Sequence, residues 1–180
     1  MSSIVLSGDT SGTVTVAVPA VAGTNTVTIA AQTGTLNAAG PAFSAYVSAT
    51  SSLPNATFTK ITFNAEEFDT NNNFDSTTNY RFTPTVAGYY QINSVITQTS
   101  SSATGLITMA IYKNGANFKQ GIQIPISVVG SIINVSALVY CNGSSDYIEI
   151  YAYQSTGSTI TTYNGGASYN YFQGFLVRGA

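Results

Sequence analysis

The sequence has no histidine, no tryptophan and only one cysteine, Cys141. Without histidine, neither a Ser-His-Asp nor a Cys-His nucleophilic system can form in its usual arrangement. A zinc site loses its commonest ligand for the same reason, and a single thiol does not replace it. One cysteine also excludes an intrachain disulfide, so stability has to come from packing or from the association of chains.

Charge is scarce as well, since only 7% of the residues are charged, against about 25% in an average soluble domain. The net charge is −2, and the few basic residues are spread along the chain: Lys60, Arg81, Lys113, Lys119 and Arg178. A nucleic-acid binder needs a basic stripe that neutralises phosphates, so nucleic acid is excluded as a partner. An anionic membrane surface is excluded for the same reason, because no polybasic segment is present.

Long apolar runs are missing, although 44% of the residues are hydrophobic. The longest candidate, residues 122–138, is interrupted by Pro125, Gly130 and Asn134, whereas a spanning helix needs about 18 apolar residues. The first four residues, Met-Ser-Ser-Ile, have neither a positive n-region nor the start of an apolar h-region. We therefore expect no membrane insertion and no signal peptide, hence synthesis in a cytoplasm, or else a chain whose signal has been removed.

A pair of carboxylates is the remaining route to catalysis, as in the hydrolysis of glycans. The acids are Asp9, Glu66, Glu67, Asp69, Asp75, Asp146 and Glu149. Glu66 and Glu67 are adjacent, so on a strand they would point to opposite faces. We expect no enzyme; a glycosidase is the alternative if other acids pair in space.

The first forty residues differ from the rest of the chain. Residues 1–37 contain no aromatic side chain and a single charge, Asp9. Small polar and β-branched residues alternate over residues 13–18 and 26–30, which predicts thin strands. Such strands cannot build a core alone, so we expect a β-structured stalk or attachment segment in which identical copies wrap around one another. A disordered Ser/Thr/Gly leader is the alternative interpretation.

The hydrophobic mass lies beyond a hinge at residues 38–41, because all 12 tyrosines and 9 phenylalanines follow it. Strand signals recur there at short intervals, separated by Asn, Gly, Ser and Pro: residues 43–48, 57–63, 79–83, 89–97, 106–112, 122–129, 133–141, 147–154, 158–162 and 171–178. About ten short strands without helical periodicity predict an all-β sandwich or jelly roll. We therefore divide the chain into residues 1–40 and a head, residues 41–180.

The head carries motifs in a specific order. They include Phe82-Thr83-Pro84 followed by Gly88-Tyr89-Tyr90, then Lys113-Asn114-Gly115, and finally Phe172-Gln173-Gly174-Phe175-Leu176-Val177. Asn114-Gly115 predicts a two-residue hairpin turn, and Gly174 leaves room for an aromatic neighbour over its backbone. Together these blocks resemble the C1q-like globular domain of the tumour-necrosis-factor-like jelly-roll superfamily, over about residues 41–180.

The resemblance implies a homotrimer in which Tyr and Phe of one sheet meet at the three-fold axis, with binding through loops at the exposed end. Residues 21–36 resemble leader segments of bacteriophage tail and head fibre proteins. We therefore expect a virion protein that attaches to other virion proteins through its N-terminal segment. Its head would bind a host-surface receptor such as a glycan; the alternative is a purely structural capsid or tail decoration protein.

Two sets of candidate ligand-binding residues follow from the loops. Asp69, Asn71, Asn73 and Asp75 offer oxygen ligands at alternate positions, as a calcium loop does, although the glycine at the sixth position and the acid at the twelfth are missing. A polar surface turn is the alternative there. No other cofactor is expected.

The second set lies between the last strands, where tyrosines are frequent. Alternating tyrosines on strands more often pack a core or a trimer seam than bind sugars, so the better binding candidates lie in loops. We predict Asn142, Asp146, Tyr163 and Asn164 as ligand-binding residues in loops distal to the attachment segment.

Overall fold

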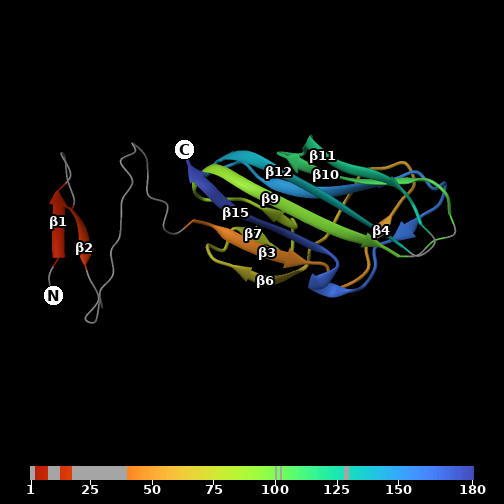
Figure 1. Cartoon of the computed structure of the whole chain (residues 1–180), viewed down its shortest axis with the longest axis horizontal. Coiled ribbons are helices and arrows are strands. Elements are labelled where there is room, and N and C mark those ends of the chain that lie inside the picture. Colours follow the sequence, from red (N-terminus) through yellow and green to blue (C-terminus); the bar gives the residue numbers. More distant parts are fainter. Residues whose placement is uncertain (1–2, 8–12, 18–39, 100, 102, 128–129) are drawn as a thin grey trace. The chain divides into compact units, whose positions relative to one another are not determined.

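The computed structural model describes residues 3–7, 13–17, 40–99, 101, 103–127 and 130–180. Backbone contacts divide the chain into two compact units, Met1–Gly34 and Thr35–Ala180. In the first unit β1 (Ser3–Ser7) pairs with β2 (Thr13–Ala17) in an antiparallel ladder (Figure 1). β2 corresponds to the strand predicted at residues 13–18. The strand predicted at 26–30 lies outside the described residues, and the role of this unit as a stalk stays a prediction.

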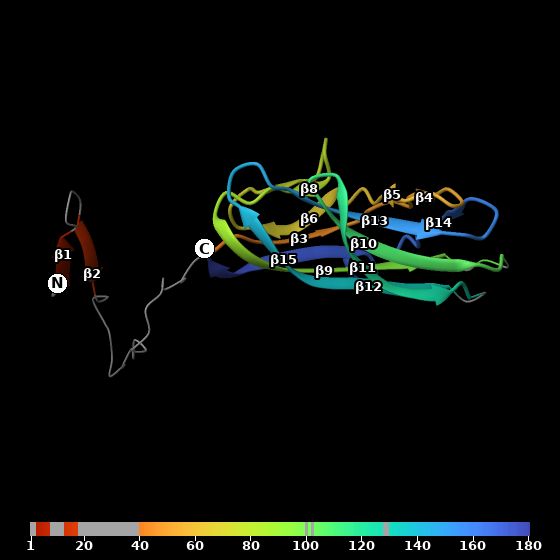
Figure 2. The ribbon, with the colours of Figure 1, turned by 90° about the horizontal axis from the view of Figure 1, so that it is seen from above.

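The second unit, which contains the head, is a sandwich of two main antiparallel sheets whose strands run along its long axis (Figures 1 and 2). The five-stranded sheet has the order β12 (Ser131–Asn142), β9 (Ala87–Gln98), β15 (Tyr171–Gly179), β3 (Ala42–Tyr46) and β6 (Ala65–Asp69). The six-stranded sheet has the order β11 (Ala116–Pro125), β10 (Leu106–Lys113), β13 (Ile148–Gln154), β8 (Arg81–Phe82) and β7 (Phe74–Asp75), with β5 (Thr59–Lys60) paired to β13. β4 (Ser52–Leu53) and β14 (Ile160–Thr161) form a separate short pair.

Alternation along the strands places the core between the two sheets. On β9 and β12 every second residue is buried, apart from the half-buried Ala137 on β12, and the residues between face outward, as a strand with one covered face requires. Phe43 lies at the centre, with ring centroids 4.3 Å from Phe82 and 4.9 Å from Phe172. A Cβ at Gly174 would lie 3.1 Å from the Phe43 ring, which confirms that an aromatic neighbour packs over this glycine.

The hairpin predicted at Asn114-Gly115 is confirmed. Lys113 pairs with Ala116, and the two turn residues have φ of 53° and 77°, the left-handed region that such a turn needs. β11 therefore begins at Ala116, and the prediction of a strand over 122–129 was wrong in its bounds. β11 is an edge strand exposed along most of its length, so its sequence lacks the alternation of a half-buried strand.

Three short strands of the head were not predicted: β4, β6 and β7. The sequence of β6, Ala-Glu-Glu-Phe-Asp, has two adjacent acids and no alternation of apolar residues. It becomes a strand because it pairs with β3 along the edge of the five-stranded sheet. Tertiary pairing overrides local propensity at such positions.

The head has two ends, named here from their backbone contacts. At the proximal end Leu176 N–H donates to Pro41 O (3.0 Å) and Ala180 N–H donates to Ala87 O (3.1 Å), so both chain ends of the head lie there. At the distal end β9 finishes and Tyr163 N–H donates to Thr97 O (2.7 Å). No helix in the described part of the chain has the length and hydrophobicity of a membrane span.

Two buried glutamines predict opposite effects of the same substitution. Gln98 is 1% exposed, and its amide has no hydrogen-bond partner in the described part of the head. Gln154 is also buried, but its Nε2 donates to Leu53 O and Ser158 O, and its Oε1 accepts from Thr156 N–H and Oγ1. Because an unpaired buried amide costs about 1–3 kcal/mol, we expect Gln98→Leu to raise the free energy of unfolding and Gln154→Leu to lower it. Thermal denaturation of both variants measures this, and a lower Tm for Gln98→Leu contradicts it.

Candidate functional site

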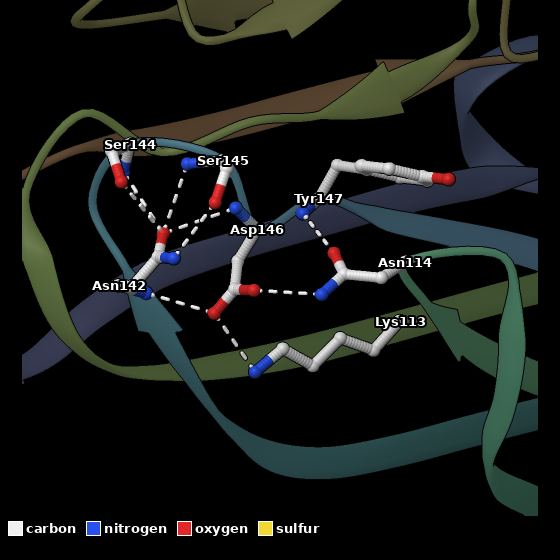
Figure 3. Close-up of polar contacts among 7 residues, drawn as sticks. All are labelled: Lys113, Asn114, Asn142, Ser144, Ser145, Asp146 and Tyr147. Carbon is white, nitrogen blue, oxygen red and sulfur yellow. Dashed lines mark hydrogen bonds and ion pairs between the residues drawn. The ribbon is translucent and has the colours of Figure 1, made fainter.

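The turn between β12 and β13 is organised by one side chain, that of Asn142 (Figure 3). Its Oδ1 accepts hydrogen bonds from the backbone N–H groups of Ser144, Ser145 and Asp146, each at 3.0 Å. Gly143 supplies the left-handed backbone that the turn needs, with φ of 72°. The side chain of Asn142 therefore shapes its own loop, as asparagine commonly does in tight turns.

Asp146 connects this turn to the hairpin between β10 and β11 (Figure 3). Its Oδ2 lies 2.9 Å from Lys113 Nζ and accepts from Asn142 N–H at 3.0 Å, while its Oδ1 accepts from Asn114 Nδ2 at 2.7 Å. Asn114 Oδ1 in turn accepts from Tyr147 N–H at 2.9 Å. Asp146 is buried, so these contacts stabilise the two turns against each other.

This turn lies at the proximal end of the head, because Asn142 pairs with Ala87. The structure thus separates the four predicted ligand-binding residues into two pairs at opposite ends of the sandwich. Asn142 and Asp146 are proximal rather than distal, and their polar atoms contact each other and neighbouring turns. Tyr163 and Asn164 are distal, as predicted.

The distal loop presents two exposed tyrosines. Tyr163 and Tyr169 are each 44% exposed, with ring centroids 5.2 Å apart and planes at 74°. A Cβ at Gly165 would lie 2.4 Å from the Tyr169 ring and 2.7 Å from that of Tyr163, so any other residue there would displace the rings. The buried Asn170 holds the loop, since its Nδ2 donates to Tyr163 O and its Oδ1 accepts from Thr97 N–H. The tyrosine pair is therefore held in place before any ligand binds.

Neither Tyr169 nor Asn170 was among the predicted ligand-binding residues. The run Tyr163-Asn164-Gly165-Gly166 marked the loop, but the partner of Tyr163 lies six residues further on, beyond η1 (Gly166–Ser168). Neither residue has a local motif. Only the folding of the loop brings the second ring to the first.

The four candidate calcium ligands form a tightly hydrogen-bonded loop. Asp69 accepts from Asn71 N–H and Phe74 N–H, and Asn73 Oδ1 accepts from Thr85 N–H. Asp75 accepts from three consecutive backbone N–H groups, at residues 77–79. The hydrogen bond from Thr78 is the largest of the effects that lower the pKa of Asp75.

Calcium binding at these residues stays a prediction. The oxygens of Asp69 and Asp75 already accept backbone donors, and in the described part of the chain no group of three or more His, Cys, Asp or Glu side chains could hold a metal ion. These hydrogen bonds make the loop a rigid surface turn.

One face of the five-stranded sheet carries exposed apolar side chains, the feature that sequence analysis expected at a trimer axis. We call them the apolar face: Phe68, Tyr89, Ile132, Leu138, Tyr140, Phe175 and Val177. Each is between 42% and 62% exposed, and they come from β6, β9, β12 and β15. Leu138 and Phe175 both pair with Gln91, so they flank it on neighbouring strands. Exposed apolar side chains gathered on one sheet face are typical of interaction surfaces.

No protein-family model matches the chain, and no curated protein matches its sequence. Several solved structures share its fold. The globular domain of zebrafish complement 1qA protein is 18% identical, with a TM-score of 0.52, over 78% of this chain and 99% of that one. Murine APRIL at pH 5.0 is 6% identical, with a TM-score of 0.57, over 77% and 100%. The PRD1 vertex protein P5 is 15% identical, with a TM-score of 0.54, over 77% and 97%.

The head is therefore a C1q/TNF-like jelly roll, which confirms the fold that the ordered sequence motifs predicted. None of the three names denotes an enzyme.

The contacts of Asp146 predict loss of stability in acid. Hydrogen bonds from Asn114 and Lys113 to the ionised carboxylate lower its pKa below the ordinary value. Such a group stabilises the fold above its unfolded pKa, about 3.9, and this contribution is lost as the pH falls through the lower, folded pKa. We expect Tm to fall below about pH 5, less steeply in Asp146→Asn, which should be about 1–2 kcal/mol less stable at pH 7. Circular-dichroism melts across this range measure both, and equal slopes for variant and parent contradict the prediction.

Proposed function

We propose that this chain is a trimeric virion structural protein whose C1q-like head adheres to a host-surface receptor such as a glycan. Residues 1–40 would attach it to other virion proteins. The proposal assigns no catalytic activity to the head. Its virion role is supported by the resemblance of residues 21–36 to fibre leaders and by the shared fold of a protein named as a vertex protein.

The apolar face is the main observation that supports the proposed trimer. Its side chains are exposed in the single chain, and a protein with this little charge has few means of keeping such a patch soluble. A closed three-fold ring joins two different surface patches of each copy, so the face of one copy would meet a second surface of the next. The C1q-like resemblance implies three copies around such an axis.

A row of polar side chains next to the apolar face would set the register of the copies. Gln91 Nε2 donates to Ser136 Oγ at 2.9 Å and to Asn93 Oδ1 at 3.1 Å, and Ser136 Oγ donates to Asn93 Oδ1 at 2.8 Å. These groups already satisfy one another across β9 and β12. These mutual hydrogen bonds lower the free-energy cost of covering the three side chains with a neighbouring copy.

The distal tyrosine pair supports adhesion. Tyr163 and Tyr169 combine apolar ring faces with hydroxyl groups, and such residues are enriched in binding surfaces. They lie at the end of the head opposite to Pro41, where the N-terminal segment joins it. Three copies would present three such pairs, so weak single contacts would add through avidity.

The trimer predicts a molar mass in solution three times the 18.8 kDa of the chain. Leu138→Asp combined with Phe175→Asp should shift the mass to that of the monomer, because two buried, unpaired carboxylates would face the neighbouring copy. Leu106→Asp is the matched control, since Leu106 is an exposed leucine on the other sheet. Light scattering after size-exclusion chromatography measures the molar masses of the parent chain, the double variant and the Leu106→Asp control. A monodisperse monomer for the parent chain contradicts the proposal.

Adhesion predicts that the head binds host cells and that the distal pair is needed. Tyr163→Ala with Tyr169→Ala should lower binding of the labelled trimer to host cells by about tenfold or more, as loss of paired aromatic anchors does at other interfaces. Molar mass and Tm should remain those of the parent. A parent trimer that does not bind host cells would leave the purely structural decoration protein as the function.

A further inference from the structure

A polar groove opens over β6 and the β7–β8 hairpin, away from the distal tyrosine pair. Its volume is about 460 Å³, within the range of about 300–1,000 Å³ that small-molecule sites occupy. Its lining residues include Glu66, Asn73, Asp75, Ser76, Arg81 and Thr83. Hydroxyl, amide and charged groups thus prevail in a concave surface.

The walls of the groove are held by hydrogen bonds within the loop. Asp75 accepts from the backbone of residues 77–79 and from Asn79 Nδ2 at 2.8 Å. Asn73 Oδ1 accepts from Thr85 N–H at 3.1 Å, and Thr83 N–H donates to Asn73 O at 2.8 Å. A ligand would therefore meet a shape that already exists, which lowers the conformational entropy lost on binding.

Arg81 is positioned in this groove by an aromatic ring. Its guanidinium carbon lies 4.2 Å from the ring centroid of Tyr147, whose backbone N–H is fixed by Asn114. The ion pairs of the described residues are Lys60–Glu149 and Lys113–Asp146, so the guanidinium of Arg81 is paired with no carboxylate there. Its five N–H donors form a fixed fork suited to bidentate acceptors.

Glu66 offers the complementary group. It lies exposed on β6, outside both ion pairs, and it lines the same groove as Arg81. The lining of the groove thus includes Arg81 with its guanidinium donor, Glu66 with its carboxylate acceptor, and two residues that carry hydroxyl groups, Ser76 and Thr83.

The charges of the groove decide the class of ligand. Glu66 and Asp75 outnumber Arg81, and the whole chain carries a net charge of −2, so a polyanion is repelled. A neutral sugar matches better, since each hydroxyl both donates and accepts and adjacent hydroxyls can bridge a carboxylate or a guanidinium.

We propose that this groove binds an uncharged sugar unit of a glycan, with Arg81 and Glu66 as its anchoring residues. The inference rests on the proposed adhesive function and adds a carbohydrate subsite distinct from the distal tyrosine pair. The preference for neutral over acidic sugars is its chemical signature.

The test begins with the full-length chain on an array of neutral oligosaccharides of glucose, galactose, mannose, rhamnose and N-acetylglucosamine, beside sialylated and uronic-acid glycans. The neutral glycan that binds best is then titrated calorimetrically into the parent, Arg81→Gln and Glu66→Ala. Lys119→Gln removes a positive charge from the exposed strand β11 and is the matched control. Tyr163→Ala reports on the distal pair.

The expected result is a neutral glycan whose affinity falls about tenfold, or 1.4 kcal/mol, in Arg81→Gln and Glu66→Ala. Lys119→Gln should leave the affinity unchanged, and Tm should show that all variants are folded. A loss of affinity in Tyr163→Ala but not in Arg81→Gln would assign the glycan to the distal tyrosine pair and overturn the inference. The inference is overturned if no neutral glycan binds, if only acidic glycans bind, or if Arg81→Gln binds the neutral glycan as the parent does. Failure of host-cell binding would overturn the adhesive function, whereas the titration shows whether the groove binds a neutral sugar.

Discussion

The register of β9 is the constraint on which the rest of the head depends. β9 pairs with β12 over its whole length and with β15 on its other side, so it lies inside the five-stranded sheet. A slip of one residue would send Tyr90 and Ile92 to the outer face and bring Tyr89 and Gln91 into the core. The same alternation that fills the core therefore also builds the apolar face.

Short polar side chains set the geometry at both ends of the sandwich. Asn142 and Asp146 hold the proximal turns, and Asn170 holds the distal loop that presents Tyr163 and Tyr169. Asp75 does the same for the wall of the groove. Asn142 and Asp75 each accept three backbone donors, whereas Asp146 and Asn170 each accept one and add contacts to side chains or to a carbonyl. Such hydrogen bonds hold the turns of a chain whose single cysteine can form no intrachain disulfide.

The proposed surfaces are separate in space and in chemistry. The apolar face would be covered by other copies, the distal tyrosine pair would meet the receptor, and the groove would take a neutral sugar. Each uses residues that the core does not need, because they lie on outward faces or in loops. Function can therefore vary on this fold without loss of packing.

Local patterns in the sequence determined the all-β class, the central strands, the turn at Asn114-Gly115 and the packing site at Gly174, because each depends on strand periodicity or on the backbone freedom of one or two residues. Tertiary structure alone decided that Asn142 and Asp146 lie at the end opposite to Tyr163, and that Tyr169 joins Tyr163. It also made a strand of β6 and placed Arg81 over Tyr147. These features come from contacts between residues far apart in the chain, and the spacing of residue types carries no record of which distant segments will pair.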